Sequence, residues 1–283
     1  MDRHPPTLIS PQWQAKLDLR FTRRQDATIL SHRSHHGPLR VQKALYPEGR
    51  DLCHAIVLHP PAGICGGDEL TIAAGVGDAA HALLTTPGAG KWYRSAGPMA
   101  SQKLDFEIAA GASLEWLPQE SIVFDGARGL MESRIRLARG ASFIGWEILC
   151  LGRRAAGERF AHGELGLRTR IEQEGRLVWA EQGRICGGSR LMTAAIGLAG
   201  FSVCATLLAA GKPVGAELVA ATRGIATMET GALHGLTALP QLLVARYLGH
   251  SSEAARTWLV DIWRLLRPAM TGREAALPRI WST

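Results

Sequence analysis

Cysteine is scarce in this chain and follows no recognisable pattern. The five cysteines are odd in number, widely spaced and without a C-x-x-C pair: Cys53, Cys65, Cys150, Cys186 and Cys204. This spacing argues against a disulfide framework and against a structural zinc site. We therefore expect most of them to be small buried hydrophobic residues.

Long uncharged apolar runs are also missing. No run is long enough to span a bilayer, and residues 1–6 lack the apolar core of a signal peptide. We therefore expect a cytoplasmic location. Hydrophobic residues make up 46% of the 283 residues. That share is enough for a substantial core and disfavours disorder.

Catalytic signatures are absent as well. Residues 85–92 invite a phosphate-loop interpretation, but the pattern G-x-x-x-x-G-K-[ST] is broken at both ends, by Thr85 and by Trp92. The chain contains no G-x-S-x-G elbow and no H-E-x-x-H motif. The sequence therefore predicts that the chain is not an enzyme.

Positive charge is in excess but is not concentrated. The formal net charge is +7, and arginine supplies most of it. The arginines are dispersed, with no basic run beyond pairs such as Arg23-Arg24 and Arg153-Arg154. This pattern favours a biased composition or an acidic protein partner over nucleic acid, which basic patches would indicate.

Between about residues 70 and 185, short alternating runs lie on both sides of a glycine. One unit runs from Leu104–Ile108 through Gly111 to Ser113–Leu117, and similar units surround Gly140 and Gly175. Alternation predicts half-buried strands, and each glycine stands where a hairpin turn needs a positive φ. The sequence therefore predicts a mainly β fold of stacked layers, as in a sandwich or a solenoid.

The C-terminal third has apolar residues at helical spacing. Residues 237–249 and 252–267 are predicted as two helices that form an α-helical hairpin, with Ser252 as N-cap and Pro268 as terminator of the second. We expect one β-rich domain over residues 17–272. Residues 1–16 and 273–283 are predicted as terminal tails.

The segment 59–70 is the most informative part of the chain. It combines a proline pair, a glycine pair and a following carboxylate: His59, Pro60, Pro61, Gly66, Gly67 and Asp68. Prolines fix φ, and glycines permit positive φ and close approach of other groups. The segment is predicted to be a partner-binding or structural loop, and a tight turn between two strands is the plain alternative.

Five carboxylates lie in or beside strand-like apolar runs: Glu115, Glu120, Asp125, Glu147 and Glu181. The simpler interpretation is that they face solvent or pair with arginines. The alternative is that some of them line an internal hydrated passage for a divalent metal, for which oxygen ligands are suited. Glu147 and Glu181 each follow a tryptophan closely and are expected to face a common interior if the units stack.

Several long motifs, taken in order, resemble the UreD family of urease accessory proteins, called UreH in some organisms. The resemblance runs from about Leu17 to the C-terminus. Besides 59–70, its motifs are residues 85–95, 114–127, 157–160, 243–249 and 278–281. It implies a mostly β body with C-terminal helices.

The resemblance also implies a function. Proteins of this family bind apo-urease and a UreF-type protein that recruits a UreG-type GTPase, and they assist nickel delivery without a tightly bound cofactor. On this basis a transient Ni²⁺ path is expected along Asp68, Glu120, Glu147 and Glu181. Lys91, Tyr93 and Arg94 are expected to bind a partner or to shape a loop.

Two other functions remain open on the residues alone. One is a small-molecule enzyme with a pocket under the 59–70 loop and Asp68 or Glu120 as acid or base. The other is a generic β-rich interaction module.

Overall fold

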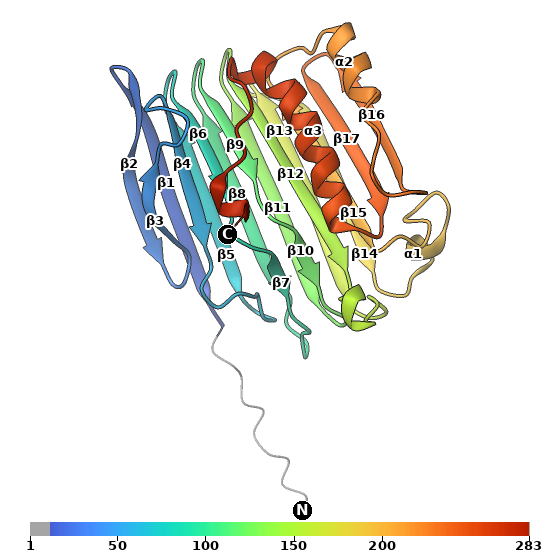
Figure 1. Ribbon diagram of the computed structural model, residues 1–283. Helices are drawn as coiled ribbons and strands as arrows, with labels where there is room; N and C mark the ends of the chain where they lie inside the picture. The colour runs from blue at the N-terminus through green and yellow to red at the C-terminus, as the bar shows by residue number, and fades with distance from the viewer. Residues whose placement is uncertain (1–11, 283) are drawn as a thin grey trace, which may run out of the picture.

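The computed structural model describes residues 12–282 and shows two β-sheets packed face to face, with helices on one outer side (Figure 1). Sheet A has seven strands in the order β14 (Arg176–Cys186), β13 (Glu164–Gln173), β11 (Arg128–Leu137), β8 (Ala100–Ile108), β5 (Glu69–Val76), β1 (Gln14–Arg24) and β2 (Ala27–His36). The ten-stranded sheet B runs in the order β16 (Leu233–Leu239), β17 (Leu242–Gly249), β15 (Val203–Ala210), β12 (Ser142–Leu151), β9 (Ser113–Leu117), β6 (His81–Thr85), β4 (Leu52–Leu58) and β3 (Arg40–Leu45). Strands β7 (Gly90–Trp92) and β10 (Ser121–Val123) extend sheet B beside β12.

The chain winds between the two sheets like a solenoid. In sheet A, β1, β5, β8, β11 and β13 are parallel neighbours, and in sheet B the same holds for β4, β6, β9 and β12. The predicted mainly β fold with stacked, solenoid-like layers is therefore confirmed. The hairpin interpretation of the glycines is correct only at Gly175, between the antiparallel strands β13 and β14.

Gly111 and Gly140 instead lie in arches that carry the chain from one sheet to the other. Both have positive φ values, 64° and 68°, as a tight reversal requires. The local sequence signal of an arch and of a hairpin is the same, because both are two alternating runs around a left-handed glycine. Only the pairing of the strands distinguishes them.

The main core fills the space between the sheets. Strand β8 shows how the sequence produces it, since Leu104, Phe106 and Ile108 point inward while Lys103 and Glu107 are exposed. The outer face of sheet A meets solvent and carries ion pairs between strands. Arg136, for example, lies 2.8 Å from Asp105 and 2.7 Å from Glu107.

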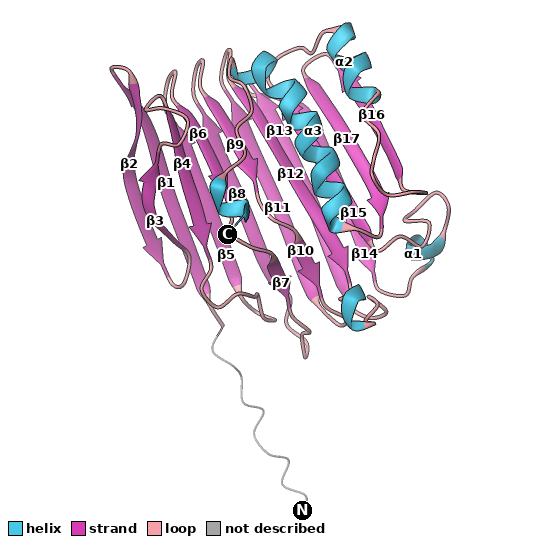
Figure 2. Ribbon diagram, viewed as in Figure 1, coloured by secondary structure: helices cyan, strands magenta, loops and turns pink. Residues whose placement is uncertain are grey.

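The outer face of sheet B is covered by helix α3 (Ser252–Thr271), which packs across β12, β15 and β17 (Figure 2). This helix confirms the second predicted helix, with two differences in its ends. The N-cap is Ser251, whose hydroxyl accepts a hydrogen bond from the Ala254 amide. Pro268 lies inside the helix, which ends at Gly272 with a φ of 74°.

The first helix of the predicted hairpin, over 237–249, is wrong. These residues form the end of β16 and the whole of β17. Strand β17 is buried on both faces, because Leu242 and Val244 enter the core between the sheets while Leu243 and Ala245 meet α3. A strand buried on both sides loses its alternation and cannot be told from a helix by periodicity. A short helix, α2 (Ala216–Arg223), contacts α3 instead.

The predicted tails extend too far into the chain. Residues 1–11 lie outside the described residues, but Gln14–Lys16 already belong to β1. At the other end, η2 (Arg279–Ser282) brings Trp281 against Trp146 and Trp263, and the Trp281 indole donates to the Thr85 hydroxyl at 2.8 Å. Aromatic packing and this hydrogen bond therefore hold in place residues that the sequence analysis predicts as a terminal tail.

A buried charge cluster lies between α3 and sheet B. Arg267 is fully buried and reaches two carboxylates, Glu48 at 2.6 Å and Glu115 at 3.0 Å. His54 lies 2.8 Å from Glu48, and His81 lies 2.9 Å from Glu115. Burial alone would raise the pKa of Glu48, but the hydrogen bonds from His54 and Arg267 lower it to about 2.

Candidate functional site

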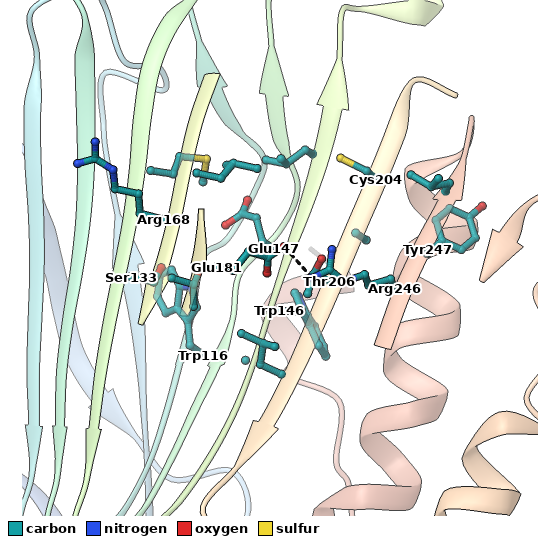
Figure 3. Close-up of a pocket in the computed structure, with 18 of the residues that line it drawn as sticks. Trp116, Ser133, Trp146, Glu147, Arg168, Glu181, Cys204, Thr206, Arg246 and Tyr247 are labelled. Carbon is teal, nitrogen blue, oxygen red and sulfur yellow. Dashed lines mark hydrogen bonds and ion pairs between the residues drawn. The ribbon is translucent and has the colours of Figure 1, made fainter. Parts of the chain in front are cut away.

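A cavity of about 480 Å³ lies between the two sheets, toward the end formed by β13 to β17 (Figure 3). Most of its wall is apolar, including Phe106, Trp116 and Phe143. Its polar lining includes Glu147, Glu181, Arg168, Arg246 and His234. Such a concave, mainly apolar space with a few convergent polar groups is typical of a functional site.

Glu147 is the polar group of greatest interest in this cavity. It lies on β12 with the same inward parity as Phe143 and Leu149, and the Ser121 hydroxyl donates to its Oε1 at 2.8 Å. Among the described residues it has no ion-pair partner. Burial raises its pKa to about 7, and the Ser121 hydrogen bond opposes that rise only in part.

Glu181 enters the same cavity from β14, so both carboxylates face a common interior (Figure 3). Its environment differs, because Arg246 on β17 lies 2.6 Å from its Oε1. The Glu181 side chain is 32% exposed. The Glu181–Arg246 ion pair therefore connects sheet A to sheet B at the solvent side of the cavity.

Cys204 also lines the cavity, and burial raises the pKa of its thiol to about 12. A thiol is a strong metal ligand only as the thiolate. Between these two groups, the carboxyl of Glu147 rather than the thiol of Cys204 is therefore able to gain or lose a proton near neutral pH.

Glu120 does not line this cavity. Its carboxylate faces α3 and forms an ion pair with Arg256. Successive side chains of an extended segment point to opposite faces. Ser121, the next residue, points inward and binds Glu147, so the side chain of Glu120 points to the other face. Of the four residues predicted for a metal path, the structure therefore brings only Glu147 and Glu181 together, and a path through all four stays a prediction.

Asp68 is 1% exposed and holds a loop together. Its two oxygens accept hydrogen bonds from the backbone amides of Trp13 and Cys65, both at 2.8 Å. The amide of Asp68 donates in turn to the Cys65 carbonyl. The backbone bond closes a β-turn over residues 65–68, and the carboxylate reaches back to the first amide of that turn. The geometry therefore supports the structural interpretation of this loop.

We expect Asp68→Ala to lower the free energy of unfolding by about 1–3 kcal/mol, because two enclosed amides lose their acceptor. Urea unfolding followed by circular dichroism measures this change. Asp78→Ala is the matched control, since the exposed Asp78 carboxylate accepts one hydrogen bond, from the Ala110 amide. An Asp68→Ala variant as stable as the wild type that no longer supports the chain's activity would instead give Asp68 a direct functional role.

The glycines of this loop are required by close contacts as well as by backbone angles. Gly67 has a φ of 93°. A Cβ on Gly66 would lie 2.2 Å from the Ser95 hydroxyl, and one on Gly63 would lie 2.1 Å from the Tyr93 ring. His59, at the start of the loop, has a buried Nε2 without a hydrogen-bond partner in the described part of the chain. The prolines Pro60 and Pro61 are exposed.

The loop is joined to the residues around Lys91, Tyr93 and Arg94. The Ile64 amide donates to the Lys91 carbonyl at 2.7 Å, and the Tyr93 amide donates to the Ile64 carbonyl at 2.9 Å. The Tyr93 and Phe124 rings pack at right angles, with their centroids 5.0 Å apart. The Arg94 side chain is 73% exposed and lies 3.4 Å from Asp125. The structure thus brings these sequence motifs together, while their partner-binding role stays a prediction.

Sequence reasoning missed Arg246, Arg168 and Cys204 as lining residues. Arg246 is not recognised as a lining residue from the sequence, because its segment is predicted as a helix and is a strand in the structure. An arginine inside the apolar run Leu242–Tyr247 was the available signal, since such a charge needs a partner. No residue of the 59–70 loop lines the cavity, so the pocket expected for an enzyme under that loop is not this one.

Within residues 12–282, no group of three or more His, Cys, Asp and Glu side chains is placed to hold a metal ion. No helix in this described part is both long and apolar enough to cross a membrane.

Comparison with known proteins gives a consistent result. The profile of the family described as UreD urease accessory protein matches residues 14–282. The chain is 54% identical over 277 residues to the urease accessory protein UreD of Dechloromonas aromatica, covering 97% of this chain and 96% of that protein. It is 54% identical over 274 residues to the UreD of an Azoarcus species, covering 96% and 95% of the two chains. For the UreD of Pseudomonas aeruginosa the identity is 49% over 280 residues, covering 99% and 98%.

Proposed function

The chain belongs to the UreD family of urease accessory proteins, and from this premise we propose that it is a non-catalytic scaffold for urease maturation in the cytoplasm. In this proposal it binds the urease apoprotein together with UreF-type and UreG-type proteins. It assists the delivery of Ni²⁺, its cargo, to the urease active site.

The observation that carries the proposal is the cavity with Glu147 in its wall. A carboxylate whose pKa is about 7 is close to half ionised at neutral pH, so an arriving cation displaces a proton and a returning proton releases the cation. Oxygen ligands of this kind bind a divalent metal without the strength of a thiolate site. Transfer needs this weakness, because the ion has to leave again.

The Glu181–Arg246 pair supports a second step. Arg246 neutralises Glu181 at the solvent side of the cavity. A cation can therefore bind the Glu181 carboxylate only when this ion pair opens. A partner that binds beside β14 and β17 and draws Arg246 away would expose Glu181 to the cargo. Binding and transfer would then be coupled through one side chain.

The experiment co-produces urease subunits with UreF-type and UreG-type proteins, with and without this chain, and measures nickel per urease and urease activity. We expect both quantities to depend on the chain, and the chain to co-purify with its partners. Urease that fills with nickel equally well without the chain would contradict the proposal.

The same preparation tests the alternative of an interaction module without a role in transfer. In that case assembly would depend on the chain, but preformed complexes would load nickel at the same rate after the cavity carboxylates are neutralised.

A further inference from the structure

Five loops gather at one end of the sandwich, the lower end in Figure 1. We call them the loop end; they are residues 59–68, 93–99, 124–127, 152–163 and 187–202. Backbone hydrogen bonds join them in a row, from the Tyr93 amide to Ile64, from the Ser95 amide to Gly126, from the Gly126 amide to His162, and from the Gly187 amide to Gly163. Adjacent loops therefore form one continuous surface.

The acidic residues of the loop end are used internally. Asp68 is buried against two amides. Asp125 accepts hydrogen bonds from the Ala161 and His162 amides, at 2.8 and 2.7 Å. Glu158 accepts from the Asp125 amide and pairs with Arg153 at 2.6 Å. The exposed fractions of the Asp125 and Glu158 side chains are only 15% and 21%.

The basic residues of the same loops point outward. Arg154, Arg159 and Arg190 are exposed and form no ion pair within the described residues. Arg94 is 73% exposed even though it contacts Asp125. The loop end therefore exposes positive charge to solvent. The carboxylates of the same loops are largely buried.

Large apolar side chains lie among these arginines. Met99 is 44% exposed, Leu191 is 41% exposed and Ile196 is completely exposed. Trp13, 47% exposed, adjoins the 59–68 loop through the hydrogen bond of its amide to Asp68. Arginine, methionine and tryptophan are enriched in protein interfaces, whereas a nucleic-acid surface would need a continuous basic stripe.

We propose that the loop end is a docking surface for an acidic face of a partner protein, to which Met99 and Ile196 contribute apolar contacts and the exposed arginines of the same loops contribute charge contacts. This inference rests on the proposed function, since it assigns one surface to the partners of the maturation complex. The backbone hydrogen bonds between its loops favour docking without rearrangement.

The test reverses three arginines that form no ion pair within residues 12–282, in the variant Arg154→Glu/Arg159→Glu/Arg190→Glu. The matched control, Arg139→Glu/Arg176→Glu, reverses exposed arginines at the opposite end of the sandwich. Affinities for apo-urease and for a UreF-type protein are measured separately by biolayer interferometry at low and high salt. We expect the triple variant to bind at least one of them about tenfold more weakly, which corresponds to ~1.4 kcal/mol, and to lose most of the salt dependence.

The control variant should bind like the wild type, and thermal melting should show both variants folded. Ile196→Asp should weaken the same interaction at all salt concentrations. A triple variant that binds both proteins like the wild type would overturn the inference and leave the proposed function intact. A wild-type chain that binds neither protein would contradict the proposed function itself. If the triple variant loses only affinity for a single-stranded oligonucleotide, the surface serves nucleic acid and the inference is wrong.

Discussion

Arg267→Met is expected to lower the free energy of unfolding by about 3–5 kcal/mol, the usual effect of removing one partner from a buried ion pair. Arg267 and Glu115 are both fully buried. The substitution would leave Glu48 and Glu115 as enclosed carboxylates held only by His54, His81 and the Trp263 indole. Chemical denaturation followed by circular dichroism measures the loss.

The pH dependence of this loss has a defined sign. Hydrogen bonds and the arginine charge hold the pKa of both carboxyl groups below their ordinary value, to about 2 for Glu48. A depressed pKa contributes stability above the unfolded value near 4.5, and this contribution disappears as the pH falls toward 2. The difference between wild type and variant should therefore be greatest above about pH 5 and shrink in acid.

Arg264→Met is the matched control for this prediction. It lies on the same helix, is 49% exposed and pairs with Asp261, so its loss should cost less than about 1 kcal/mol. If Arg267→Met does not fold, Arg267→Lys, which keeps the charge without the bidentate geometry, gives an intermediate variant. Equal effects of the two methionine substitutions would show that the cluster does not anchor α3.

Glu147→Gln is expected to reduce the nickel content of matured urease by about tenfold, as a rise of ~1.4 kcal/mol in the transfer barrier would produce. The amide keeps the shape and can still accept from Ser121, but it cannot exchange a proton for a cation. Glu181→Gln should have a smaller effect because Arg246 already neutralises that residue, and the double variant should be the most impaired. Metal analysis, urease activity and a pull-down for assembly are the measurements.

Glu107→Gln is the control for this series, since that carboxylate is 56% exposed, pairs with Arg136 on the outer face of sheet A and does not line the cavity. We expect it to leave nickel delivery unchanged. Loss of assembly in parallel with loss of nickel in Glu147→Gln would reduce Glu147 to a packing role. Full nickel loading in the double variant would remove both cavity carboxylates from the path.

Glu147→Gln should also raise the free energy of unfolding at pH 8, whereas Arg267→Met should lower it. The raised pKa of Glu147, about 7, means that the folded protein disfavours the ionised form. The wild type therefore loses stability as the pH rises from about 4.5 through 7, by roughly 3 kcal/mol in all. The neutral amide has no such loss, so the variant should be the more stable protein at pH 8.

The sequence predicts strands well where only one face is buried. In β8 and β11 the alternation is visible because the other face meets solvent. The prediction fails in β17, because α3 covers the second face of that strand and apolar residues then no longer alternate with polar ones. The N-cap of α3 was misplaced by one residue because Ser251 and Ser252 are equally suitable by type.

The site was predictable to the extent that strand parity determines it. Glu147 and Glu181 share an interior because each points inward from its own strand. Asp68 and Glu120 could not be assigned in this way, since the first lies in a loop and the second in an irregular segment before β10. Their partners, Trp13 and Arg256, are 55 and 136 residues away in sequence, and no local pattern reveals such contacts.

The solenoid winding has a consequence for how this protein can vary in length. Each coil, such as β5 with β6, contributes one strand to each sheet and hydrogen-bonds mainly to the coils before and after it. The cavity draws its lining from β8 onward and uses no residue of β1 to β6. A change in length or sequence of the first coils therefore leaves the lining of the chamber untouched, provided that Glu48, His54 and His81 keep the cluster around Arg267 that holds α3 in place.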